Sequence, residues 1–191
     1  MKVHQLSVIY EQAQDRILAR INTTAGEELR VWLTRRLCLK LWPTLNKAVA
    51  EHVVRQKVRT GQAQAPMGHA DDRTRQMMVE FDRHESLQKV DFKTPYKAQP
   101  SLLPLGAEPL VVTLVTMSPL ENGSLQLDFQ EKLSDRNTQR GFQMAMEPQT
   151  MHSFIHLLDK ALTRSGWLDD VTAPPASATP AVAVEKPKYL N

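Results

Sequence analysis

The chain has 191 residues, of which 41% are hydrophobic and 24% charged. This length and composition suit one compact domain of ordinary size, or two small lobes that share a hydrophobic core. Its formal net charge is only +3, and its single cysteine, Cys38, excludes an intrachain disulfide framework. No apolar run approaches the ~18 residues of a membrane-spanning helix, so we expect a soluble protein of a reducing compartment, the cytoplasm, with Cys38 buried and inert.

The first sixty residues have the pattern of three strands followed by a helix. The three strand-like segments are rich in β-branched and aromatic residues and are separated by turn residues: 5–10, 16–21 and 28–33. Thr34 suits the N-cap of a helix whose apolar residues recur every three or four positions. Because Pro43 lies within this helix, we expect either a kink or a break near Trp42.

Residues 61–107 connect the two halves of the chain. We expect a flexible link over 60–70 and then a middle helix from Asp71 to about Lys89. The apolar side of that helix should hold four residues: Met77, Met78, Phe81 and Leu87. Prolines between Phe92 and Pro109 exclude a regular element, so the chain should cross there from one lobe to the other.

Residues 108–169 repeat the order of the first unit. The expected strands are 110–117, 125–130 and 141–146, with a hairpin turn at Asn122-Gly123 and a polar loop over 133–140. A helix should begin at Pro148 and end before Gly166, where these residue types commonly stand. The segment 170–191 is rich in alanine and proline, so we expect a disordered tail.

The two units also match in their helices. Leu45-Asn46-Lys47-Ala48-Val49 and Leu158-Asp159-Lys160-Ala161-Leu162 agree in chemical type at an offset of 113 residues. The sequence therefore predicts an α+β fold: an antiparallel three-strand sheet followed by a helix, duplicated about a pseudo-two-fold, with one additional middle helix. This order is similar in outline to the sheet-and-helix units of whirly-type single-stranded-DNA-binding proteins, whose units have a fourth strand.

The two units differ in charge. Residues 1–60 carry 11 Lys and Arg against 5 Asp and Glu, whereas residues 108–191 carry 7 against 10. Such asymmetry can attract an anionic partner to one lobe, or draw two lobes or two chains together.

The units differ most on the sheet face that should point away from the helices. In the second unit this face carries ordinary polar residues, whereas in the first it mixes guanidinium groups with an indole and two aliphatic side chains: Arg16, Arg20, Arg30, Trp32, Ile9 and Leu18. Arginine neutralises phosphates and an aromatic ring stacks on bases, as a single-stranded nucleic-acid groove requires. We favour the alternative, in which arginine stems and apolar groups pack under a second chain or the middle helix.

Arg35 and Arg36 fall in the first turn of the predicted first helix, where the helix dipole disfavours cations. A bound phosphate or carboxylate would compensate for this. The interpretation that we favour is neutralisation within the fold by the nearby Glu27 and Glu28.

No constellation of residues indicates catalysis or a resident cofactor. His152 and His156 have the spacing of helical zinc ligands, but no third ligand is near them in sequence, so we interpret them as polar positions beside the apolar stripe. There is no glycine-rich phosphate loop. We therefore expect a non-catalytic binding or assembly protein that uses the Arg and Trp face for a protein partner or for self-association. The alternative is single-stranded nucleic-acid binding.

Overall fold

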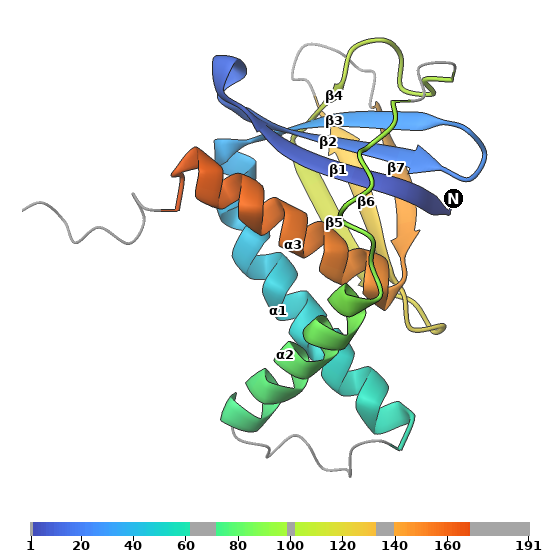
Figure 1. The fold of residues 1–191 in the computed structure, drawn as a ribbon, viewed down its shortest axis with the longest axis vertical. Helices are drawn as coiled ribbons and strands as arrows, with labels where there is room; N and C mark the ends of the chain where they lie inside the picture. Colours follow the sequence, from blue (N-terminus) through green and yellow to red (C-terminus); the bar gives the residue numbers. More distant parts are fainter. Residues whose placement is uncertain (1, 62–71, 99–101, 133–139, 169–191) are drawn as a thin grey trace, which may run out of the picture.

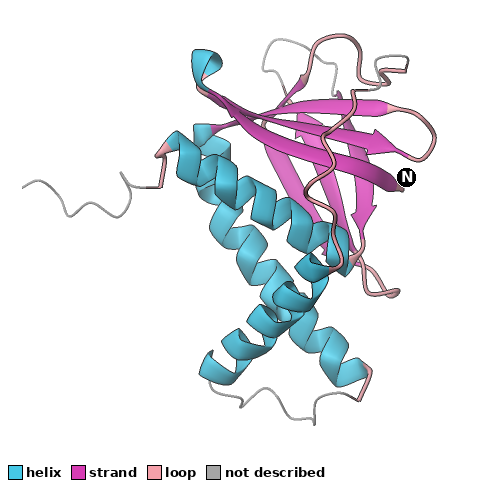
Figure 2. Ribbon diagram, viewed as in Figure 1, coloured by secondary structure: helices cyan, strands magenta, loops and turns pink. Residues whose placement is uncertain are grey.

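A computed structural model of the chain describes residues 2–61, 72–98, 102–132 and 140–168. Within these residues the fold is α+β, with two sheets, mostly antiparallel, and three α-helices (Figures 1 and 2). The predicted link over 60–70, polar loop over 133–140 and tail over 170–191 lie wholly or largely outside the described residues.

The first sheet has four strands in the order β1-β2-β3-β4. Strands β1 (Val3–Glu11), β2 (Arg16–Thr23) and β3 (Glu28–Thr34) form the predicted antiparallel meander, with a short 3-10 turn at Gln12–Gln14. Strand β4 (Leu110–Val112) pairs with β3 in parallel, from the far end of the sequence. The expectation of three strands in this sheet was therefore wrong, because β4 occupies the edge that β3 would otherwise leave open.

The second sheet is a meander of β5 (Leu114–Pro119), β6 (Leu125–Glu131) and β7 (Arg140–Met146). The predicted strand over 110–117 is divided at Thr113, so that one stretch of chain contributes β4 to the first sheet and β5 to the second. The burial pattern changes phase at this break: Leu110 and Val112 are buried before it, whereas Val115 and Met117 are the partly buried positions after it. The sequence did not show this shift, because the exposed Leu114 continues the earlier apolar alternation.

The three helices follow the sequence pattern closely. Helix α1 (Arg35–Arg59) is capped by Thr34, whose hydroxyl accepts a hydrogen bond from the Leu37 amide at 3.3 Å. Helix α1 continues through Pro43, so of the two expected alternatives, a kink or a break near Trp42, the break is wrong. Helix α2 is Asp72–Gln88, and α3 (Pro148–Ser165) ends at Gly166 in the left-handed conformation, both as predicted.

One hydrophobic core joins both sheets to α1 and α3. The period-two pattern correctly places the helix-facing side chains of the two sheets, which are buried except for the half-buried Leu6 and Phe142. The fully enclosed members come from every layer: Ile17 and Leu33 of the first sheet, Leu127 and Phe129 of the second, Leu45 of α1, and Met151 and Leu158 of α3. The two sheets therefore share one core, and each sheet contributes to the stability of the other.

Helix α2 packs against its neighbours through other residues than the sequence predicted. It crosses α1 below the sheets and packs on α1 and α3 (Figure 1). Met77 and Phe81 were expected on its packed side, yet each is 66% exposed. Val79 and the ionic group Asp82 provide the contacts instead. Of the four residues expected on the apolar side of α2, Met78 and Leu87 are thus partly buried, whereas Met77 and Phe81 are not.

Gly141 in β7 is required by the close approach of the neighbouring strand. A Cβ atom at this position would lie 2.5 Å from the backbone oxygen of Phe129 in β6. We expect Gly141→Ala to lower the unfolding free energy by about 1–2 kcal/mol, since a backbone atom cannot move aside without disturbing the ladder. Urea denaturation measures this, with Gln143→Ala on the same strand as the control, and equal effects of the two substitutions would contradict the steric explanation.

Candidate binding face of the first sheet

The outer face of the first sheet, which is turned away from the core, carries the residues that the sequence singled out. The strand register aligns four of them in one line across all four strands, which we call the apolar row: Ile9, Leu18, Trp32 and Val111. Ser7, Arg20 and Arg30 form the line on one side of this row, and Glu11, Arg16 and Thr34 form the line on the other. All members of the apolar row are partly exposed.

Arg20 and Arg30 are occupied by another part of the same chain. The connection between α2 and β4 is described over 89–98 and 102–109, and these two stretches, which we call the crossover segment, run across this face (Figure 1). The guanidinium carbon of Arg20 lies 4.6 Å from the ring centre of Tyr96, an arrangement typical of a cation–π contact. Arg30 donates a hydrogen bond to the Ala107 carbonyl at 2.5 Å. These two arginines therefore fasten the crossover segment to the sheet.

Asn22 completes this attachment. The Tyr96 hydroxyl donates to Asn22 Oδ1 at 2.6 Å, and Asn22 Nδ2 donates to the Lys97 carbonyl at 2.7 Å. Burial raises the pKa of the Tyr96 hydroxyl above its usual range, so this group remains a donor. Asn22 itself is fully buried, and both ends of its amide are satisfied. The sequence offered no local signal for this arrangement, because its partners are more than seventy residues apart.

The remaining predicted site residues gather at the other end of the face. Arg16 pairs in register with Thr34, directly before Arg35 and Arg36 in the first turn of α1. Arg16 is partly exposed, and its guanidinium group has no hydrogen bond or ion pair within the described residues. Arg36 is exposed. The structure therefore places Arg16, Arg35 and Arg36 beside one edge of the apolar row, away from Arg20 and Arg30.

The expected neutralisation of Arg35 and Arg36 by Glu27 and Glu28 is wrong. The two glutamates stand at the start of β3 and the two arginines follow its end. At roughly 3.4 Å per residue, a seven-residue strand separates them by about 20 Å. Glu27 instead accepts a hydrogen bond from the Thr23 hydroxyl at 3.2 Å in its own turn.

The groups that could support catalysis or metal binding have other roles in the structure. Cys38 is fully buried, and burial raises the pKa of its thiol to about 12, so the nucleophilic thiolate is not formed near neutral pH. His152 lies 3.0 Å from Asp82, whereas His156 lies against the ring of Phe92. Within the described ranges, no three His, Cys, Asp or Glu side chains come together as metal ligands would.

Comparisons with protein-family models, with curated proteins and with solved structures gave no match for this chain. In the part of the chain that the structure describes, none of the helices has the length and apolar composition needed to cross a bilayer.

Proposed function

We propose that the protein is a non-catalytic binding protein that holds a protein partner on the outer face of its first sheet. The observation that carries this proposal is the apolar row, which spans all four strands and is still partly exposed. A tryptophan at its centre and arginine beside it are the residue types that contribute most to protein interfaces. The partner would place apolar side chains over Trp32 and an acidic side chain against Arg16.

A protein partner fits this face better than a nucleic acid does. Arg20 and Arg30 are held against the crossover segment, which limits the approach of a phosphate to their guanidinium groups. One tryptophan then remains as a stacking platform, with Arg16, Arg35 and Arg36 near it. Single-stranded nucleic-acid binding and self-association of two copies therefore stand as the alternative outcomes of the test. A cytoplasmic setting accords with the single buried cysteine.

We further infer that the fold arose by internal duplication. In each half, three strands in meander order precede a helix, β1–β3 before α1 and β5–β7 before α3. Helix α1 begins at Arg35 and α3 at Pro148, which preserves the 113-residue offset seen in the sequence. In this interpretation the second unit supplies scaffold, and the first carries the binding face.

The test places a photo-crosslinking amino acid, p-benzoylphenylalanine, at position 32 in the organism that encodes the chain. We expect an ultraviolet-dependent adduct with another polypeptide, identified by mass spectrometry, which is lost when Arg16→Glu is added. The same crosslinker at Lys40, which is exposed on α1, is the matched control. An adduct with a second copy of the chain or with nucleic acid, or the same adduct from position 40, would overturn the proposal.

Once the partner is known, Trp32→Ala should weaken its binding about tenfold or more, since truncation of a central interface tryptophan costs about 2 kcal/mol. Isothermal titration calorimetry measures this effect. Circular dichroism of the variant should remain that of the parent, because Trp32 lies outside the hydrophobic core. An unchanged affinity would remove Trp32 from the interface.

A further inference from the structure

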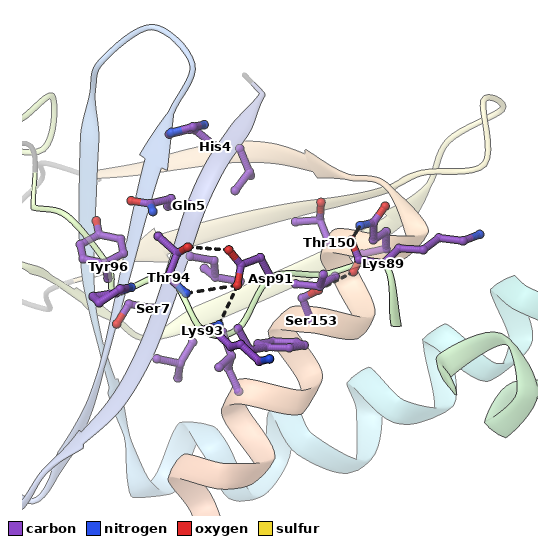
Figure 3. A pocket seen from close by; sticks show the side chains of 18 of the residues that line it. His4, Gln5, Ser7, Lys89, Asp91, Lys93, Thr94, Tyr96, Thr150 and Ser153 are labelled. Carbon is purple, nitrogen blue, oxygen red and sulfur yellow. Dashed lines mark hydrogen bonds between the residues drawn. The ribbon is translucent and has the colours of Figure 1, made fainter. Parts of the chain in front are cut away.

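A second candidate binding site lies beside β1 and is separate from the apolar row, although it adjoins it at Ile9. It is a cleft of about 640 Å³, which we call the edge cleft, within the size range of ligand sites. One wall is the strand residues Val3–Ile9, and the other is the part of the crossover segment from Lys89 to Tyr96 (Figure 3). The first turns of α3 close its end with Gln149, Thr150, Ser153 and Leu157.

The strand wall of the edge cleft is an open sheet edge. Strand β1 is the outermost strand of the first sheet and pairs with β2 alone. Among the described residues, the crossover segment passes β1 without a backbone hydrogen bond to it, and the Lys97 amide donates to the side-chain oxygen of Gln5. Within the described ranges, the β1 backbone groups that face away from β2 therefore have no partner. Such a row of free donors and acceptors is a template for another strand.

The edge is also regular over most of its length. A register shift is confined to its start, between Val3 and Gln5, and the pairing from Gln5 to Glu11 is uninterrupted. The seven cleft-lining residues of β1 extend over roughly 20 Å at 3.4 Å per residue. A peptide of about six extended residues would therefore match the strand wall.

The charged residues of the crossover wall indicate which side chains such a peptide would carry. Asp91 is turned into its own loop, where it accepts hydrogen bonds from the Thr94 hydroxyl and from the amides of Lys93 and Thr94. Lys89 is paired with Glu85 at 2.8 Å. Lys93 has no such partner among the described residues. Asp91 is ionised but held within its own loop, so Lys93 is the cation of this wall that has no ion-pair partner among the described residues.

We propose that the edge cleft binds an extended segment of a partner protein, which adds to the first sheet as a strand beside β1 and places an acidic side chain against Lys93. Main-chain hydrogen bonds to β1 supply affinity, and contacts of the segment's side chains with the opposite wall and with α3 supply specificity. A second copy of the chain does not fit, because its own β1 lies behind the same crossover wall. A free strand edge also has no complementarity to a phosphate backbone.

The test begins with selection from a phage-displayed library of random dodecapeptides on the immobilised full chain. We expect enriched peptides that alternate β-branched residues and contain glutamate or aspartate. The best of them is then synthesised with fluorescein, and its affinity is measured by anisotropy. Hydrogen exchange of residues 3–9 should slow when the peptide is added, because their free amides become paired.

One modification of the peptide and three substitutions in the chain distinguish strand addition from other binding modes. Methylation of alternate backbone nitrogens of the peptide should weaken binding about tenfold or more, because strand addition depends on those donors. Lys93→Glu should weaken it about fivefold or more, whereas Lys40→Glu, an exposed lysine of α1, should leave it unchanged. Trp32→Ala should also leave it unchanged, which separates this site from the proposed binding face.

The proposal fails if no peptide is enriched over a surface without protein, if the methylated peptide binds equally well, or if exchange slows elsewhere and not in β1. It also fails if the chain without peptide is a dimer in sedimentation with β1 already protected, since a second copy would then occupy the edge.

Discussion

Replacement of Glu131 by alanine is expected to lower the free energy of unfolding by about 3 kcal/mol. This side chain is only 5% exposed and joins the two sheets. One carboxylate oxygen accepts from the Val111 amide of β4 at 2.9 Å, and the other accepts from Arg140 of β7 at 2.8 and 2.6 Å. Its loss leaves the amide of β4 unsatisfied and removes the ion pair together with packing. The loss should not exceed about 3 kcal/mol, because the Arg140 side chain is 46% exposed and water can solvate its guanidinium group in the variant.

Urea denaturation followed by circular dichroism measures this effect. Glu131→Gln should be intermediate, since its amide oxygen can still accept from Val111 while its NH₂ group faces the donors of Arg140. Glu108→Ala, at an exposed position of the crossover segment, is the control and should change stability by about 0.5 kcal/mol or less. If Glu131→Ala behaved like this control, the carboxylate would not be what joins the sheets.

Replacement of Asp82 by alanine is expected to lower the free energy of unfolding by about 2–3 kcal/mol, the second large effect. Asp82 of α2 lies 3.0 Å from His152 Nε2 of α3 and 3.3 Å from Lys57 Nζ of α1, so one carboxylate holds all three helices. The His152 side chain is 2% exposed and would lose its partner in a buried position. Lys57, at 20% exposure, can turn toward water, which limits the loss.

Acid denaturation also tests the contribution of the Asp82 carboxylate to stability, because that contribution depends on its ionisation. The hydrogen bond from His152, together with Lys57, holds the pKa of Asp82 below its usual 3.8, against the opposing effect of burial. Because the pKa is lower in the folded state, the stabilisation is present above pH ~4 and is lost as pH falls through the folded pKa. The difference in stability between the parent and Asp82→Ala should therefore shrink below pH ~4. Glu85→Ala, a surface residue of the same helix, is the control. A difference independent of pH would show that packing, and not charge, dominates.

The sequence predicted the parts of the fold that depend on short-range periodicity. Alternation placed Val31 and Leu127 in the core, and Pro148 with Gly166 marked both ends of α3, because these signals depend on neighbouring residues alone. It did not predict the attachment of Tyr96 to Asn22 or the pairing of β3 with β4, which join residues more than seventy positions apart. For the candidate site, the sequence alone could not show that Arg20 and Arg30 contact the crossover segment, because these contacts also join residues more than seventy positions apart.

The pairing of β3 with β4 also has a consequence for synthesis on the ribosome. Strand β3 ends at Thr34, and the three residues that cover its edge begin at Leu110. At roughly 5–20 residues per second, the ribosome needs about 4–15 seconds to make the intervening chain. During that interval the nascent meander of β1–β3 exposes both of its edges. Cells that translate this message quickly, or that supply a chaperone to the emerging chain, should therefore yield more soluble protein.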